Sequence, residues 1–584
     1  MLPHQQRKKY KTVNSFALKQ TLKKMNRLIY YLLLILPLYL MTACNDSDNS
    51  RQAAVKQSNG NGEENTGISF QYSKEEAGRI IEQWVDSTEL KTDLPKINEE
   101  GVAEDIFTFY SKRNFIPAWN ASTASRLVKI TQNIDQEGLN PASYPIDTIQ
   151  TLMQQAQQEN SAETGAKLDI LLSATYLKLA DVIATGKVKP GNFYKSWHIK
   201  PEAPDTLYTH LQEAVDNGDV NASLDYFRPR FDQYEKLQQY IETYTEIAKN
   251  GGWPKIDGTG ELQPGDSSQR VETIRQRLHL SGDLTSGPAE WTNPAVYDSS
   301  LVSAVNNFQL RMGLEVQPAI TSEVIEAMNV PAETRLKQIA LNLDRIRWFS
   351  SGDMPPTYVL VNLPEYKLQV VEDGEKIKTM KVVVGKQMNS TPIFSDKIQY
   401  AVFSPYWNVP NSIATDEIWP KARNNPGYLS QRHYEVLDGW GSDAKIINPS
   451  EIDWDNLRNY RIRQKPGPWN SLGRVKFMFP NDYAIYLHDT PADHLFDEYT
   501  RAFSHGCIRV EEPAWLADWL FPQYNRQEVR SKMNNTNRDV VSLEQDVPVY
   551  ILYLTSFVDD NGNINFREDL YELDKRLTPQ FDVI

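Results

Sequence analysis

Cysteine and histidine are scarce in this chain, with two cysteines and eight histidines among 584 residues. These numbers give no basis for a structural zinc site, and we expect neither a metal nor a cofactor. The chain also has no basic domain with interleaved aromatic residues, and its formal net charge is −14, so a nucleic-acid partner is not expected. Hydrophobic residues make up 40% and aromatic residues 11%, which excludes a disordered protein and allows several domains.

The first 67 residues have the layout of an export segment followed by a tether. The segment MNRLIYYLLLILPLYLMTAC, Met25 to Cys44, has a basic flank before about 16 mostly apolar residues. This length is typical of a secretory signal and short for a spanning helix, which needs about 20 residues. We therefore predict a signal peptide over 1–44, with Met25 as a candidate start. The polar, Gly/Asn/Ser-rich residues 45–67 predict a flexible tether.

The end of the export segment, LMTAC, resembles a bacterial lipobox. That resemblance implies cleavage before Cys44 and lipidation of this residue. The protein would then be exported, held to a cell-envelope membrane by its lipid and facing the periplasm. The alternative is an uncleaved signal anchor with an idle cysteine. If Cys44 carries lipid, Cys507 has no disulfide partner, and a free thiol in an exported protein is a candidate reactive group.

Helical spacing of apolar residues dominates the first half of the chain. Over 68–250, segments such as AKLDILLSATYLKLADVIATGK repeat apolar residues at intervals of three and four, which predicts a helical scaffold domain. Residues 267–330 contain two amphipathic helices around a loop. The run FQLRMGL within them resembles a small three-helix peptidoglycan-binding module, and a helical spacer that binds nothing is the alternative. Residues 331–356 predict a linker helix.

The spacing of apolar residues along the sequence changes after Pro356. Segments such as YVLVNLPEYKLQVV alternate, which predicts a mainly-β domain over 357–557. Residues 411–470 interrupt this domain with charged, aromatic and Pro/Gly-broken sequence without clear strands, which predicts a structured capping insertion. Residues 558–584 are expected to form a C-terminal tail. The predicted fold class is therefore multidomain α+β, with a helical scaffold, a small three-helix module and a mainly-β domain that carries a capping insertion.

Three of the eight histidines and one of the two cysteines lie within IYLHDTPADHLFDEYTRAFSHGCIRV, residues 485–510. His488 ends a predicted strand, and SHGC follows after 15 intervening residues. A cysteine nucleophile reacts as a thiolate, while the ordinary thiol pKa is about 8.5, so a neighbouring imidazole is the usual means of activation. His488 and His505 are the candidate bases for Cys507.

Other groups of this stretch could bind a substrate. Backbone amides around Gly506 and Cys507 could hold an oxyanion, and Arg509 shares the alternation phase of Cys507 and could bind a carboxylate. The alternative is that Cys507 is an inert core cysteine.

Asp489 and His494 have weaker claims to a role. Asp489 follows His488, but adjacent residues of a strand point to opposite faces, so a backbone carbonyl is an equally good partner for the imidazole. His494 lies in the loop between the two motifs, where we expect it to be exposed to solvent.

The pattern of HDTP followed by SHGCIRV resembles the signature of L,D-transpeptidases with a YkuD-type catalytic domain, the cysteine acyltransferases of bacterial cell walls. The helical regions and the insertion resemble the large multidomain branch of that family. The resemblance implies that Cys507 attacks the carbonyl between the L-centre of meso-diaminopimelate and the terminal D-Ala of a tetrapeptide stem, while His488 takes the thiol proton. D-Ala then leaves, a thioester forms, and an amine of a second stem completes a 3→3 cross-link.

The resemblance also implies supporting roles within the same motif. Ser504, His505 and Gly506 would shape the turn and the oxyanion region, and Arg509 would bind or order the substrate. The insertion would close over the peptidoglycan stem peptides, and a carbapenem would acylate Cys507. An L,D-carboxypeptidase that uses water as acceptor and a catalytically idle, lipid-anchored wall-binding protein remain alternatives. The sequence does not indicate an oligomeric state.

Overall fold

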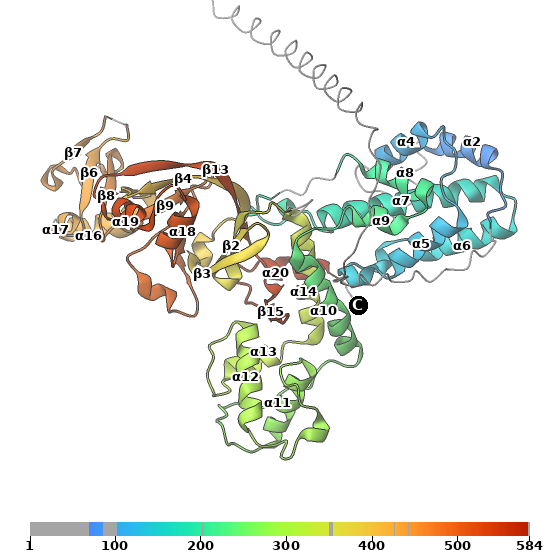
Figure 1. Ribbon diagram of the computed structural model, residues 1–584, viewed down its shortest axis with the longest axis horizontal. Coiled ribbons are helices and arrows are strands. Elements are labelled where there is room, and N and C mark those ends of the chain that lie inside the picture. Colours follow the sequence, from blue (N-terminus) through green and yellow to red (C-terminus); the bar gives the residue numbers. More distant parts are fainter. Residues whose placement is uncertain are drawn as a thin grey trace, which may run out of the picture. The chain divides into compact units, whose positions relative to one another are not determined.

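The computed structural model describes residues 69–85, 102–199, 204–349, 354–425, 427–441 and 443–581. Figure 1 shows their helices and strands. The predicted signal peptide, the tether and Cys44 lie outside these residues, so those expectations stay predictions. Within the described ranges, no helix is long and apolar enough to cross a membrane.

The predicted helical scaffold forms around one buried helix, α7. The helices here are α2 (Lys74–Val85), α4 (Val102–Lys112), α5 (Ala121–Gln132), α6 (Ile146–Gln158), α7 (Ala162–Thr185), α8 (Leu207–Asn217) and α9 (Val220–Asp225). The side chains of α7 are buried on nearly every face, because the other helices contribute to one apolar core around it. Its Asp169 accepts hydrogen bonds from the hydroxyl of Tyr110 and the backbone amides of Ala118 and Trp119, so this buried carboxylate fixes the start of α5.

Five further helices lead to the sheet: α10 (Asp232–Lys249), α11 (Gln269–Leu280), α12 (Ser299–Met312), α13 (Ser322–Met328) and α14 (Ala332–Phe349). Helix α12 begins at the cap Asp298, whose side chain accepts from the Leu301 amide, and ends at Gly313 in the left-handed region. Buried Arg311 of α12 pairs with Asp283 at 2.6 Å and donates to the carbonyl of Ile564 at 2.7 Å. This hydrogen bond connects the region of α11, α12 and α13 to the C-terminal residues of the chain.

The mainly-β domain is built on one nine-stranded sheet. Its strands are β1 (Tyr358–Asn362), β2 (Lys367–Glu372), β3 (Glu375–Gly385), β4 (Phe394–Phe403), β9 (Val475–Met478), β10 (Leu487–His488), β11 (Ala502–Ser504), β12 (Ile508–Val510) and β13 (Asp539–Leu552). Their order is β11-β3-β12-β10-β9-β4-β13-β1-β2, and β2 also pairs with β3, so the sheet closes on itself. Helices α18 (Pro513–Leu520) and α19 (Arg526–Asn534) follow β12.

The insertion contains a sheet of its own, so the expectation of a segment without clear strands was wrong. Its strands are β5 (Trp407–Asn408), β6 (Tyr434–Asp438), β7 (Lys445–Ile447) and β8 (Tyr460–Gln464), in the order β5-β8-β6-β7, beside α15 (Asn411–Ile413), η7 (Ala414–Ile418), α16 (Trp419–Asn424) and α17 (Gly427–Gln431). The strands are only two to five residues long, so each offers too few positions for its alternation to stand out in the sequence. A separate apolar cluster packs the helices against these strands.

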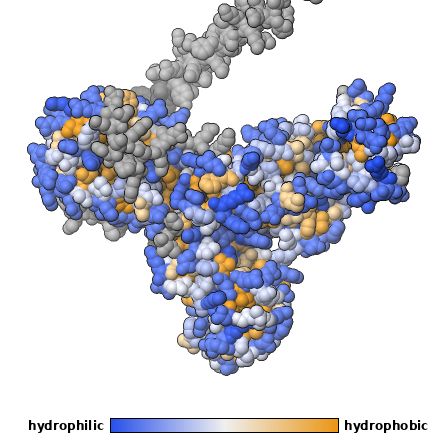
Figure 2. Space-filling view, turned by 180° about the vertical axis from the view of Figure 1, so that it is seen from behind, coloured by the Kyte–Doolittle hydropathy of each residue, from blue (hydrophilic) through white to orange (hydrophobic). Residues whose placement is uncertain are grey.

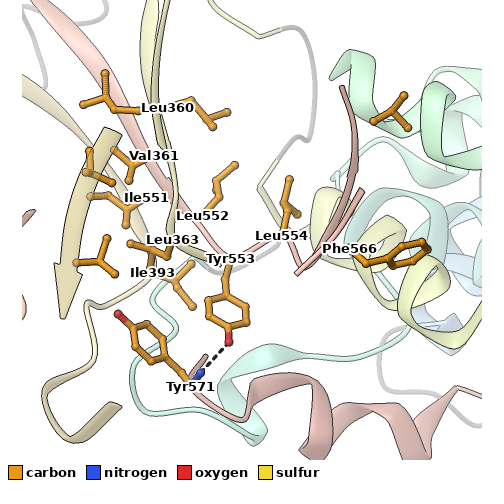
Figure 3. Close-up of a cluster of buried hydrophobic side chains, with 14 of the residues drawn as sticks. Leu360, Val361, Leu363, Ile393, Ile551, Leu552, Tyr553, Leu554, Phe566 and Tyr571 are labelled. Carbon is orange, nitrogen blue, oxygen red and sulfur yellow. Dashed lines mark hydrogen bonds between the residues drawn. The ribbon is translucent and has the colours of Figure 1, made fainter. Parts of the chain in front are cut away.

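The residues predicted as a C-terminal tail contain β15 (Ile564–Phe566), which pairs with β14 (Ser556–Val558), and α20 (Leu573–Leu577). Tyr571, Leu573 and Leu577 are buried in the main apolar core. Figure 3 shows the hydroxyl of Tyr553 accepting from the backbone amide of Tyr571, at 2.8 Å, beside the apolar residues of β1 and β13. These residues therefore contribute to the core of the β-domain.

The predicted multidomain α+β class, with a helical scaffold and a mainly-β domain, is confirmed by this arrangement. The exact domain boundaries stay predictions. Figure 2 shows one face of the molecule, on which hydrophilic residues predominate and hydrophobic residues form small separate groups.

Candidate active site

One row of side chains crosses three neighbouring strands of the large sheet. Lys476 of β9 pairs in register with His488 of β10, and His488 pairs with Arg509 of β12. Residues directly opposite on neighbouring strands share a sheet face, and the strands lie about 4.8 Å apart. The adjacent row, from Phe477 through Leu487 to Ile508, is fully buried. The row of His488 therefore lies on the face opposite the core, with a cation on either side of the imidazole.

Cys507 lies at a bend immediately before β12 and is half-buried. It precedes Arg509 by two residues, so by strand alternation it belongs to the side of the sheet that carries His488. Its Sγ lies 3.6 Å from the carbonyl oxygen of Ala484. Among the described residues, no hydrogen bond joins Sγ to the His488 ring. Catalytic hydrogen bonds are often long in the absence of substrate. The missing bond between Cys507 and His488 is therefore consistent with a nucleophile and base that come together when substrate binds.

The His488 ring is oriented by a backbone carbonyl. Nδ1 lies 2.5 Å from the carbonyl oxygen of Asp489, which assigns the ring proton to Nδ1 and leaves Nε2 as an acceptor. Burial, Arg509 and Lys476 lower the pKa of His488 to about 3, although the bond to the Asp489 carbonyl acts in the opposite direction. The imidazole is therefore neutral at physiological pH with the lone pair of Nε2 free, and a pKa this low makes it a weak base in this conformation.

The carboxylate of Asp489 does not face this ring. It accepts from the backbone amides of Arg474 and Thr490, both at 2.7 Å. A Cβ on Gly473 would lie 2.3 Å from the Asp489 carboxyl carbon, so the glycine makes room for this side chain. The expectation that Asp489 points away from the base agrees with these contacts.

Some neighbours of Cys507 raise the pKa of its thiol and others lower it. Burial raises the pKa of the thiol. Hydrogen bonds with the backbone and side chain of Tyr486, and the charges of Lys476 and Arg509, favour the thiolate but do not reverse the effect of burial. The resting thiol is therefore protonated at neutral pH and needs a base to react.

The turn before Cys507 is held by Ser504. The Ser504 hydroxyl donates to the Cys507 carbonyl at 2.6 Å and accepts from the Gly506 amide at 3.1 Å. Gly506 has φ +116°, a backbone conformation that residues with a Cβ rarely adopt. Because the Gly506 amide is already bonded to Ser504, it is not available to an oxyanion in this conformation. The Cys507 amide has no acceptor among the described residues and is the better donor.

A buried threonine supports the same turn from the other side. Thr391 Oγ1 donates to the Gly506 carbonyl at 2.8 Å and accepts from the Gly385 amide at 3.0 Å. The hydroxyl of Tyr571 donates to the Gly385 carbonyl at 2.7 Å and accepts from the Thr391 amide at 3.3 Å. A Cβ on Gly385 would lie 2.2 Å from the carbonyl oxygen of Asn389, so only glycine fits there.

The remaining two histidines of the motif differ in their surroundings. Nε2 of His505 lies 3.1 Å from Oε1 of Glu417 in η7 of the insertion. This contact directs His505 toward the insertion, which fits a supporting role better than that of a base. His494 lies in η10 (Asp493–Phe496) and is exposed, as expected.

Sequence reasoning had not assigned Lys476, Tyr486, Thr391, Glu417 or Tyr571 to this site. Lys476 is placed beside His488 by the register of β9 and β10, and Lys476 and Tyr486 both lie close enough to Cys507 to affect its titration. Within the part of the chain that the structure describes, no group of three or more His, Cys, Asp or Glu residues could hold a metal ion.

Two parts of the chain match family models. Residues 356–534 match the L,D-transpeptidase catalytic domain, YkuD, and residues 104–241 match the Scaffold domain. A Haemophilus influenzae protein named "Putative L,D-transpeptidase" is 34% identical over 249 residues, which cover 41% of this chain. The match spans 49% of the length of that relative.

Solved structures of L,D-transpeptidases are also similar to this chain. The enzyme from Mycobacterium smegmatis is 13% identical, covers 34% of this chain and 58% of its own, and has a TM-score of 0.18. L,D-transpeptidase 1 of Mycobacterium tuberculosis is 15% identical, covers 35% of this chain and 64% of its own, and has a TM-score of 0.15.

Proposed function

Since residues 356–534 match the YkuD model of the L,D-transpeptidase catalytic domain, we propose that this protein forms 3→3 cross-links in peptidoglycan through a thioester on Cys507. The donor is a tetrapeptide stem, and the acceptor is the side-chain amine of diaminopimelate in a second stem. The observation that carries the proposal is the neutral, backbone-oriented imidazole of His488 on the sheet face of the Cys507 thiol.

In the first half of the reaction, Sγ of Cys507 attacks the carbonyl of the bond to the terminal D-Ala. The thiol proton passes to Nε2 of His488, since Nδ1 is held by the Asp489 carbonyl. The Cys507 amide donates to the oxyanion, and His488 returns the proton to the leaving amine. The products of this half are D-Ala and a thioester.

In the second half, the acceptor amine attacks the thioester and gives its proton to His488. The new amide bond forms as the C–S bond breaks, and the proton returns to the thiol. The contact between His505 and Glu417 links the turn to the insertion and supports the idea that the insertion closes over the thioester. Closure that limits water would favour the amine over hydrolysis.

The proposal extends to location and inhibition. Lipid on Cys44 would hold the protein to a cell-envelope membrane with its catalytic domain in the periplasm, and a carbapenem would acylate Cys507. These parts rest on the LMTAC segment and on the family resemblance.

Intact-protein mass spectrometry with a purified tetrapeptide tests the proposal. We expect a covalent adduct on the wild-type chain that lacks the mass of D-Ala, and a peptide dimer in the products. Cys507→Ala should give neither. A tripeptide without dimer would make the protein an L,D-carboxypeptidase, and no adduct at all would overturn the enzymatic proposal.

A further inference from the structure

The side of the sheet that carries Cys507 and His488 has cations without counterions. Lys476 and Arg509 flank His488 in the register of three strands. Arg538, immediately before β13, is close enough to lower the pKa of Lys476, together with burial. Among the described residues, none of these three side chains forms a salt bridge, and the buried Nε of Arg509 has no acceptor.

Some buried arginines elsewhere in the described residues are paired with acids, whereas Arg277 lies over the Trp253 ring and donates to the Met328 carbonyl. Arg345 lies 2.7 Å from Asp574, and Arg311 lies 2.6 Å from Asp283. An isolated buried charge is costly, so a protein normally provides such a partner. Lys476 and Arg509 have no acid partner among the described residues, and both lie beside His488 in the strand register, so their charges are available to an added anion at this position.

Within the described ranges, the Tyr486 ring is the contact recorded for the ammonium group of Lys476. Nζ lies 4.8 Å from the centre of the Tyr486 ring. A cation over an aromatic ring contributes modestly and leaves the donors of the ammonium group free for an anion. Tyr486 itself contacts Cys507, so an anion bound at Lys476 would lie near the reacting thiol.

We propose that Lys476 binds, together with Arg509, a carboxylate of the donor stem adjacent to the scissile bond. The inference rests on the proposed function and deepens it, because it names the group that makes the enzyme select its donor. Two carboxylates of the tetrapeptide meet this description: the one on the terminal D-Ala and the one on the D-centre of diaminopimelate. Both offer the same chemistry to an ammonium group and a guanidinium fork.

Three donors separate these sources: the free tetrapeptide, its D-Ala carboxamide, and its diaminopimelate D-centre carboxamide. The measurement is the rate of Cys507 acylation by intact mass. A hydrogen bond between charged groups accounts for a factor of about ten or more, so wild type should acylate at least one carboxamide about tenfold more slowly. Lys476→Met should acylate the free tetrapeptide about tenfold more slowly and lose most of this discrimination.

Two further variants serve as controls. One keeps the positive charge at position 476, and the other removes a lysine elsewhere in the sheet. Lys476→Arg keeps the cation and should retain discrimination between the acid and the carboxamide. Lys397→Met removes an exposed lysine of β4 in the same sheet and should match wild type on all three donors. In Lys476→Met, one carboxamide should be acylated about as fast as the free tetrapeptide. The position of that carboxamide identifies the carboxylate that Lys476 binds.

The outcomes separate this inference from the proposed function. If wild type is acylated but Lys476→Met slows all three donors by one common factor, or slows none, Lys476 does not bind a donor carboxylate. The same holds if Lys476→Arg loses discrimination. A wild-type chain that no donor acylates would overturn the proposed function and this inference together.

Discussion

Nε2 of His505 lies 3.1 Å from Oε1 of Glu417, so this side-chain pair joins the turn before Cys507 to the insertion. The two side chains are 38% and 46% exposed. Exposed pairs of this kind contribute about 0–1 kcal/mol, which is weak enough to break and re-form during turnover. The pair is therefore suited to guide closure of the insertion, not to lock it.

Removal of this pair should change the fate of the thioester more than its formation. In Glu417→Ala we expect acylation by the tetrapeptide within about threefold of wild type and a higher ratio of tripeptide to dimer, because the insertion would exclude water less well. Product analysis by mass measures the ratio. Asp416→Ala, an exposed neighbour on the same η7, is the matched control. An unchanged ratio in Glu417→Ala would argue against a role of the pair in closure.

The depressed pKa of His488 predicts a pH dependence of stability. Between its folded pKa of about 3 and its ordinary value of 6.5, the unfolded chain binds a proton that the folded chain does not. The free energy of unfolding should therefore fall as the pH drops through this window. His488→Asn removes this proton uptake, so its stability should fall less steeply than that of wild type between pH 6.5 and pH 4. Urea unfolding across this range measures both slopes, and equal slopes would contradict the buried, neutral state.

Thr391 should prove necessary for the geometry of the Gly506–Cys507 turn. In Thr391→Val, the Gly385 amide and the Gly506 carbonyl lose their buried partner, which costs about 1–3 kcal/mol. We expect acylation to slow by about tenfold in the folded fraction, since the nucleophile is no longer held from this side.

Thr391→Ser keeps the hydroxyl and should restore most of the rate. The exposed Thr379 of β3 provides the control variant Thr379→Val, which should behave as wild type. If valine and serine at position 391 gave equal rates, the hydroxyl would have no positioning role. Urea unfolding of each variant separates this effect from a loss of fold.

Asp489→Asn distinguishes a backbone-oriented base from a catalytic triad. In a triad, the same change in the acid lowers turnover by about 10⁴-fold. Here the carboxylate accepts from two backbone amides, so the asparagine should cost about 1–3 kcal/mol of stability while acylation stays within about threefold. His488→Ala should abolish acylation in the same assay. A loss in Asp489→Asn as large as that in His488→Ala would show that the carboxylate acts on the imidazole.

Several features of this protein follow from local patterns of residues and could be predicted without the fold. The change from a helical to an alternating period near Pro356 separates the helical regions from the sheet, because periodicity reports which faces of an element are buried. Alternation also places Cys507 and Arg509 on one side and turns Asp489 away from His488. The motif also predicts Cys507 as the nucleophile and His488 as the base, although it carries no information on the distance between them.

The groups that surround that motif come from distant parts of the chain and depend on how it folds. Lys476 stands beside His488 because β9 pairs with β10 in one register, and a shift of one residue would have placed it on the core face. Thr391 and Tyr571 reach Gly385 from segments 180 residues apart, and Glu417 reaches His505 from the insertion. Strand register and chain closure depend on contacts between residues far apart in the chain, which local periodicity does not encode, so the charges and hydrogen bonds around Cys507 could be read only from the folded chain.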